Sequence, residues 1–194
     1  VMTHMRLEFA MLAMDQIVNQ AAKWHYMFGG QASVPLTIRM IIGRGWGQGP
    51  QHSQSLHAWF AHIPGLKVVM PSEPQSAYSL LRAAIQDQDP VMFLEPRILY
   101  AERAEVDTNL KMEIGKARVL QSGDQVTVVA MGNMVNVARN AIKETGISAD
   151  LIDLATLVPW DRGTVLQSVS KTKRLVVVEE SPFSGGWGNE IVAY

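Results

Sequence analysis

One histidine stands where an imidazole could act on a bound molecule. His52 follows a segment, residues 43–49, in which glycine occupies every second position. Glycine has no side chain to hold a ligand away, so such a loop allows close approach. An imidazole near neutral pH donates to an oxyanion or relays a proton. His52 is therefore the candidate catalytic residue. The alternative is a loop histidine that caps a helix expected from Ser53 or that is satisfied by hydrogen bonds to the backbone.

The glycine-rich loop itself does not match the usual phosphate-binding patterns. A Walker loop needs Lys and then Ser or Thr after its last glycine, and a dinucleotide fingerprint needs GxGxxG opening a helix, with an acidic residue about 20 positions on. Residues 43–50, GRGWGQGP, meet neither requirement. We expect this loop, Trp46 included, to shape the wall of a site ahead of His52 and to contact another subunit.

The remaining reactive side chains suggest structural roles. The sequence has no cysteine, which excludes a disulfide, a thiolate nucleophile and a thiolate metal site, and fits a reducing compartment. Three histidines, His25, His57 and His62, fall on or beside expected helix faces, and His4 lies near the start of the sequence.

Helices and strands are expected to alternate through the first half of the chain. Apolar residues recur every three or four positions over residues 9–27, which predicts one long helix that ends at the Gly29-Gly30 pair. Aliphatic and β-branched runs predict buried strands. The expected strands are 34–42, 67–70 and 91–94, and the expected further helices are 53–61 and 74–86.

A second unit is expected beyond a charged crossing. Apolar periodicity lapses over residues 95–111, so we place a boundary near Thr108, between a domain at 1–107 and another at 108–194. Residues 122–124 resemble a hairpin turn between strands 115–121 and 125–130. Helix and strand then alternate over 135–145, 149–154, 163–170 and 174–179. The pattern predicts an α/β fold with mainly parallel sheets.

Composition excludes two classes of partner. Seventeen basic and eighteen acidic residues leave a formal net charge of -1, so no cationic field exists to attract nucleic acid. No apolar run approaches the ~20 residues that span a bilayer, so we expect no membrane partner. No targeting peptide is visible, and we expect both ends to be truncated.

Four blocks carry a resemblance to a known family: MDQIVNQAAK at 14–23, YMFGG at 26–30, QHSQSL at 51–56 and PGLKVV at 64–69. In this order they resemble the beta subunits of thiamin-diphosphate-dependent 2-oxo acid dehydrogenases, the E1 components of pyruvate, branched-chain and acetoin dehydrogenase complexes. The resemblance covers essentially the whole chain. It implies a transketolase-type pyrimidine-binding domain followed by part of a transketolase C-terminal α/β domain.

The resemblance implies a reaction and a set of partners. Such an E1 component decarboxylates a 2-oxo acid with thiamin diphosphate and passes the acyl group to a lipoyl domain of the E2 core. The family forms a heterotetramer with the E1 alpha subunit and a second beta subunit, with Mg²⁺ and the diphosphate on the alpha side. Bacterial cytoplasm or the mitochondrial matrix would be the compartment. The sequence does not identify the 2-oxo acid.

The resemblance also implies roles for two residues. His52 would lie in the active site beside the substrate and the lipoyl acceptor. Phe9 would stack on the aminopyrimidine, and the alternative is a core phenylalanine that begins a helix. The sequence departs from the family at Arg6, where aromatic or small polar residues are common, and at Leu12.

A potassium ion is often held in this family by backbone carbonyls. The matching positions are Leu36, Ala84, Ile85, Asp87 and Asp89. The alternative is an ordinary helix end before Pro90.

The catalytic carboxylate of the family is expected before residue 1, and Glu8 does not match its motif. We therefore expect the isolated chain to be inactive. Two other functions remain open: a transketolase or deoxyxylulose-phosphate-synthase relative, and a non-catalytic assembly subunit of the same fold. Apolar residues on several faces of the 9–27 helix predict a covering partner, so the full-length protein expressed without its partner should aggregate or self-associate.

Overall fold

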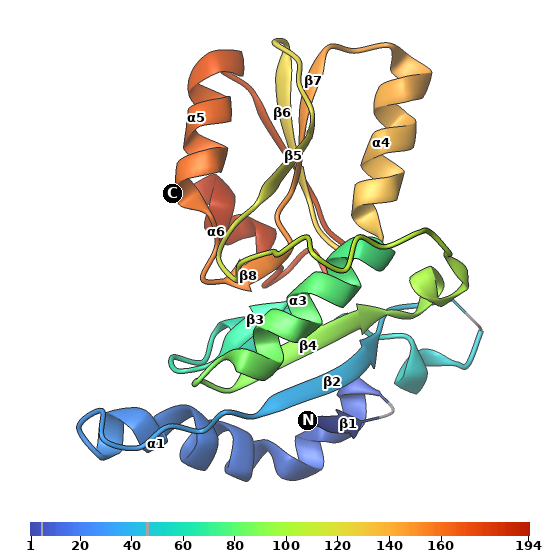
Figure 1. Cartoon of the computed structure of the whole chain (residues 1–194). Coiled ribbons are helices and arrows are strands. Elements are labelled where there is room, and N and C mark those ends of the chain that lie inside the picture. Colours follow the sequence, from blue (N-terminus) through green and yellow to red (C-terminus); the bar gives the residue numbers. More distant parts are fainter. Residues whose placement is uncertain (5, 46) are drawn as a thin grey trace.

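The chain folds around two β-sheets. The structure is a computed structural model that describes residues 1–4, 6–45 and 47–194, so Trp46 of the glycine-rich loop lies outside the described residues. The first sheet lies between helix α3 and the helical run that begins the chain, and the second lies between helices α4 and α5 (Figure 1). Among the described residues, no helix is long and apolar enough to cross a bilayer. The predicted α/β fold is confirmed.

The first sheet is parallel except at one edge. Its order is β1 (Met2–His4), β2 (Thr37–Ile42), β4 (Val91–Pro96), β3 (Lys67–Val69) and β8 (Thr156–Val158). The first four are parallel, and β8 joins β3 antiparallel. Strand β8 comes from the second half of the chain and was not predicted. The two halves therefore share a sheet, and the predicted boundary near Thr108 stays a prediction.

The second sheet corrects the predicted hairpin. Its order is β5 (Arg118–Gln121), β7 (Ala149–Asp153), β6 (Val126–Ala130) and β9 (Leu175–Val178). Strand β5 pairs antiparallel with β7, not with β6. The turn passes over the start of β7: Gly123 N donates to Asp150 Oδ1 at 2.8 Å, and a Cβ on Gly123 would lie 2.3 Å from Ala149 N. The turn at residues 122–124 was predicted correctly, but the strand before it pairs with β7 and not with the strand that follows the turn.

The segment predicted as one helix at 9–27 is helical, but its winding is not uniform. It comprises a 3-10 helix, η1 (Leu7–Ala13), a π-helix, η2 (Asp15–Ala21), and α1 (Ala22–Met27). The buried residues follow the same change: Leu7 and Ala10 are three apart in the tight segment, and Ile17 and Ala22 are five apart across the wide one. Winding changes so that apolar side chains keep facing the first sheet.

The helices predicted at 74–86, 135–145 and 163–170 lie close to their predicted positions. Pro74 opens α3 (Pro74–Gln86), and Glu73 N donates to Ser76 Oγ at 3.1 Å at its start. The remaining helices are η3 (Pro50–His52), α2 (His57–Ala61), η4 (Arg97–Ala101), α4 (Met134–Thr145), α5 (Arg162–Thr172) and α6 (Gly188–Ala193). Helix α2 is shorter than the predicted 53–61, because residues 53–56 form a non-helical connection.

One apolar core runs through both halves. Its largest cluster joins Met40 and Leu94 of the first sheet to Val129 and Ile152 of the second. Burial of this shared surface is the main force that holds the halves together.

Candidate active site

Phe9 and His52 meet at one edge of the first sheet. Phe9 follows the carboxyl end of β1, and His52 follows the carboxyl end of β2 after the glycine-rich loop. Their ring centroids are 5.2 Å apart with planes tilted by 53°. Ligands of open parallel sheets bind outside the carboxyl ends of the strands. The fold therefore places the two predicted site residues together where such sheets bind ligands.

Phe9 is not enclosed by the core. Its side chain is 40% exposed, whereas Leu7 and Ala10 on the same helical segment are 1% exposed. An aromatic face open to solvent beside an imidazole can receive a flat heteroaromatic ring. The exposed ring of Phe9 is therefore compatible with stacking of the pyrimidine ring of thiamin diphosphate.

The backbone around His52 explains its position. Gly49, with φ of 78°, turns the chain into η3, and Ser53 Oγ closes this turn by donating to Gly49 O at 2.9 Å. Helix α2 begins only at His57, so His52 does not cap it. The capping alternative is wrong.

A buried ion pair lies under the His52 loop. Arg6 is 3% exposed and Glu8 is 5% exposed, and Arg6 Nη2 lies 3.2 Å from Glu8 Oε1. Arg6 Nη2 also donates to Gly43 O at 3.0 Å, and Gln54 N donates to Glu8 Oε1 at 2.8 Å. These hydrogen bonds offset part of the cost of burying two charges. The departure at Arg6 therefore serves to hold the loop, and Glu8 is fully committed to this network.

His57 has the structural environment expected for it. It is 1% exposed, and its Nε2 lies 2.5 Å from Glu179 Oε1, just beyond the end of β9. Burial opposes ionisation of Glu179, but the hydrogen bonds from His57 and from the backbone N–H groups of Gly188 and Trp187 outweigh it and hold the pKa of Glu179 below its usual range. His57 ties α2 to the second half of the chain.

Two of the carbonyls predicted to hold potassium already accept hydrogen bonds. Leu36 O accepts from Val91 N at 2.9 Å, and Ala84 O accepts from Thr37 Oγ1 at 2.9 Å. Leu36 O keeps a second lone pair for a cation, whereas Ala84 O also accepts from Asp87 N at 3.3 Å. A cation at Ala84 O would therefore compete with that weaker bond.

The two carboxylates of the same segment face an ammonium group. Lys67 Nζ lies 2.7 Å from Asp87 Oδ1 and 3.0 Å from Asp89 Oδ2, and the Ile85 side chain points outward with 50% exposure. Two acidic groups against one basic group leave a local negative charge, which suits a monovalent cation. Among the residues that the structure describes, no cluster of three or more His, Cys, Asp or Glu could hold a metal by side chains.

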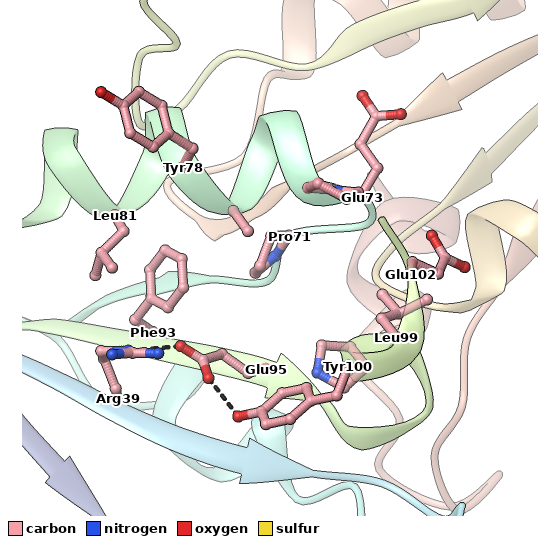
Figure 2. A pocket seen from close by; sticks show the side chains of 13 residues that line it. Arg39, Pro71, Glu73, Tyr78, Leu81, Phe93, Glu95, Leu99, Tyr100 and Glu102 are labelled. Carbon is pink, nitrogen blue, oxygen red and sulfur yellow. Dashed lines mark hydrogen bonds and ion pairs between the residues drawn. The ribbon is translucent and has the colours of Figure 1, made fainter. Parts of the chain in front are cut away.

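A separate cavity of about 380 Å³ lies beside α3 (Figure 2). On its floor Arg39 Nε donates to Glu95 Oε1 at 2.6 Å, and Tyr100 OH donates to Glu95 Oε2 at 2.5 Å. Burial, and then the hydrogen bond to Glu95, raise the pKa of Tyr100 above its ordinary value, so it remains a donor. The other lining residues are Pro71, Glu73, Pro74, Ala77, Tyr78, Leu81, Phe93, Pro96, Leu99 and Glu102.

Sequence reasoning missed this polar cluster. Its signal was a charged residue inside each of two apolar strands, Arg39 in TIRMII and Glu95 in VMFLEP. Because β2 and β4 are adjacent and parallel with Arg39 opposite Phe93, the charges fall on one face. Neither Phe9 nor His52 lines the cavity.

Two family matches cover the chain. Residues 1–103 match the transketolase pyrimidine-binding domain, and residues 115–194 match the transketolase C-terminal domain. A solved structure described as "Split gene transketolase, inactive beta4 tetramer" aligns with a TM-score of 0.78 at 25% identity, over 98% of this chain and 60% of that one.

Similar curated proteins are dehydrogenase beta subunits. The mitochondrial pyruvate dehydrogenase E1 component subunit beta-2 of Oryza sativa is 46% identical over 98% of this chain and 53% of its own length. The mitochondrial 2-oxoisovalerate dehydrogenase subunit beta of Dictyostelium discoideum is 44% identical over 93% and 51%. The acetoin:2,6-dichlorophenolindophenol oxidoreductase subunit beta of Cupriavidus necator is 46% identical over 91% and 54%.

The chain spans about half the length of these relatives. The predicted resemblance and its two domain types are confirmed. The chain therefore belongs to the transketolase family, as a pyrimidine-binding domain followed by a C-terminal domain of the kind found in 2-oxo acid dehydrogenase E1 beta subunits.

Proposed function

We propose that this chain is the part of an E1 beta subunit that binds the pyrimidine ring of thiamin diphosphate, in an enzyme that oxidatively decarboxylates a 2-oxo acid and passes the acyl group to a lipoyl domain. The observation that carries the proposal is the contact of Phe9 with His52, 5.2 Å between ring centroids, at the carboxyl ends of parallel strands. Identities of 44–46% to three dehydrogenase beta subunits support it.

Each residue has a defined task. Thiamin diphosphate, when bound, supplies a carbanion and an electron sink for the loss of carbon dioxide. Phe9 gives the pyrimidine an aromatic face, worth roughly 1 kcal/mol beyond the buried area. His52, beside that face, donates a hydrogen bond to an oxygen that gains charge, or moves a proton to and from it through its imidazole nitrogens.

The chain supplies only part of a site. Mg²⁺ and the diphosphate belong on the E1 alpha subunit, and the carboxylate that protonates the pyrimidine belongs to a segment outside these residues. Glu8 does not replace that carboxylate, because it is committed to Arg6 and Gln54. Isolated residues 1–194 should therefore be inactive. A second beta subunit and the E2 core complete the assembly.

Two details extend this proposal. Potassium would bind at the carbonyls of Leu36, Ala84, Ile85, Asp87 and Asp89, where the local charge is negative. The compartment would be a bacterial cytoplasm or a mitochondrial matrix, because the relatives include proteins named mitochondrial and a protein of the bacterium Cupriavidus necator.

The substrate would be a 2-oxo acid or an acetoin-type substrate, and sequence identity does not select one. Pyruvate, 2-oxoisovalerate and acetoin enzymes match almost equally, at 46%, 44% and 46%. The transketolase alternative has weaker support, 25% identity to a solved split-gene transketolase.

The test uses the complete beta chain co-expressed with the alpha subunit of the same source. Turnover is measured with a panel of 2-oxo acids and with ketose phosphates. We expect one 2-oxo acid to be decarboxylated, and His52→Ala to lower kcat by roughly 10²- to 10⁴-fold, as loss of a general acid or base does. His25→Ala, at an exposed position whose Nδ1 contacts Ala32 O, is the matched control.

Turnover of ketose phosphates alone would move the protein to the transketolase class. Failure to bind thiamin diphosphate, with no turnover of any substrate, would identify a non-catalytic assembly subunit.

A further inference from the structure

The segment that follows His52 is fixed at successive residues. Gln54 N donates to Glu8 Oε1 at 2.8 Å, and Gln54 O accepts from Gly43 N at 2.9 Å. One residue further, Ser55 Oγ donates to Glu180 Oε1 at 3.1 Å. Glu8 belongs to the first half of the chain, and Glu180 follows β9 in the second. The connection is therefore held from both halves.

Glu180 is the centre of the contacts on the second side. Its Oε1 accepts from Ser55 Oγ and from Arg44 N at 3.2 Å, and its Oε2 accepts from Asn133 Nδ2 at 2.9 Å. The side chain is 20% exposed, and the Arg44 guanidinium lies 3.6 Å from Oε2. One carboxylate thus fixes residues on both sides of the loop that carries His52, from Arg44 to Ser55.

Gly43 shows how closely the carboxylate approaches. A Cβ on Gly43 would lie 2.8 Å from Glu180 Oε1, so the Glu180 carboxylate would have to move away from its present hydrogen-bond donors. The backbone of Gly43 also has φ of 78°, a conformation that favours glycine. The glycine-rich loop therefore packs directly against Glu180, and this packing explains its first glycine.

We propose that Glu180 is a positioning residue that holds the His52 loop from the second domain, while Glu8 holds it from the first. The assignment of a catalytic task to His52 rests on the proposed function. The placement of the loop rests only on the contacts above. A carboxylate that accepts three hydrogen bonds in a partly buried place fixes its donors more firmly than neutral groups do. The packing of the two domains therefore sets where the imidazole lies.

The experiment changes Glu180 in the complete beta chain assembled with its alpha subunit. Two quantities are measured: hydrogen–deuterium exchange of peptides covering 43–57 without cofactor or substrate, and kcat and KM with the substrate that the wild type uses. Glu180→Ala should raise exchange in 43–57 and lower kcat by roughly 10- to 100-fold with little change in KM, because a displacement of about 1 Å costs about 10²-fold.

Further variants separate positioning from general destabilisation. Ser55→Ala leaves Glu180 in place and should give a smaller effect of the same kind. Combined with Glu180→Ala it should add almost nothing, because the contact that Ser55→Ala removes is already lost in Glu180→Ala. Glu180→Gln keeps an acceptor for Ser55 and Arg44 and should recover part of kcat. Glu144→Ala, at an exposed position on α4, is the matched control.

The outcomes are distinct. Unchanged exchange over 43–57 in Glu180→Ala, or additive effects of the two changes, would overturn the proposal. Raised exchange in a protein whose wild type turns over no 2-oxo acid would refute the proposed function but support the placement of the loop. If Glu180→Ala does not fold, unchanged exchange in Ser55→Ala would overturn the proposal instead.

Discussion

At the scale of single residues, Asp153 is the most unusual acid outside the site. It ends β7, is 0% exposed, and accepts from Ser72 Oγ at 2.6 Å and from Ala155 N at 3.1 Å. Burial nevertheless raises the pKa of Asp153 to about 6, because the two neutral donors do not replace the lost water. Ser72 belongs to the first half of the chain, so this carboxyl group also lies at the contact between halves.

Asp153 predicts a pH-dependent stability. An unfolded aspartate has a pKa of about 3.9, so between about pH 4 and pH 6 the unfolded chain ionises before the folded one. The contribution of the protonated Asp153 carboxyl group to the stability of the folded state is fully present below that range and is lost as the pH rises through it. The unfolding free energy of Asp153→Asn minus that of the wild type should therefore increase by about 3 kcal/mol as the pH rises through that range.

Urea unfolding of both proteins at a series of pH values measures this difference. Asp124→Asn, at an exposed position, is the control and should show no such change. A difference between Asp153→Asn and wild type that stays constant from pH 4 to pH 6 would contradict the raised pKa.

At the scale of elements, the carbonyls proposed to bind potassium come from the start of β2 and from the end of α3 with the residues after it. Leu36 precedes β2, and Ala84 to Asp89 close α3, joined by the hydrogen bond from Thr37 to Ala84 O. Neither element alone supplies all of the carbonyls that were predicted to bind the ion. A cation that bound only the folded state would stabilise it by mass action.

Potassium is therefore expected to raise the Tm of the complete protein. The measurement compares thermal unfolding in KCl and in choline chloride at equal ionic strength. Asp89→Asn should reduce the increment, because it removes negative charge beside the carbonyls. Identical unfolding curves in the two salts would exclude a specific potassium site.

At the scale of the whole molecule, the helical run of residues 7–27 leaves apolar surface uncovered. Leu12 is 92% exposed and Tyr26 is 89% exposed. Phe9, Met11, Trp24, Met27 and Phe28 are exposed as well. Such a concentration marks an interface in most proteins, and an alpha subunit and a second beta subunit are the proposed partners.

The complete beta chain expressed without its partner should therefore self-associate. Size-exclusion chromatography with light scattering measures the mass. Leu12→Gln should reduce association, whereas Leu166→Gln, at a 44% exposed position on α5, should not. A monodisperse monomer of the unchanged chain would be inconsistent with this prediction.

The sequence pattern within a short window was sufficient to predict several helices and strands. Helix α3 and strands β4, β6, β7 and β9 follow from periodicity and buried aliphatic runs, because propensity and amphipathicity act within a few residues. The short strand β8 did not, since three residues gain strand geometry only by pairing with β3. The mixed winding of residues 7–27 was hidden for a similar reason: contact with the sheet decides it.

The site divides in the same way. His52 was predicted from its residue type, the glycine-rich loop before it and the resemblance to a family, and Phe9 was predicted from that resemblance. Glu180, Asp153 and the pair of Arg39 with Glu95 were not identifiable as partners, because their contacts join residues distant in sequence.

The sequence by itself determined the fold class and the family, because hydrophobic periodicity and short blocks of residues carry that information locally. It also supplied the prediction that His52 does proton chemistry. Only the tertiary structure decided the sheet order, the shared core and the carboxylates that hold the His52 loop. The physical reason is that strand pairing and the burial of charge depend on which distant segments meet, and close packing of the two halves selects those segments.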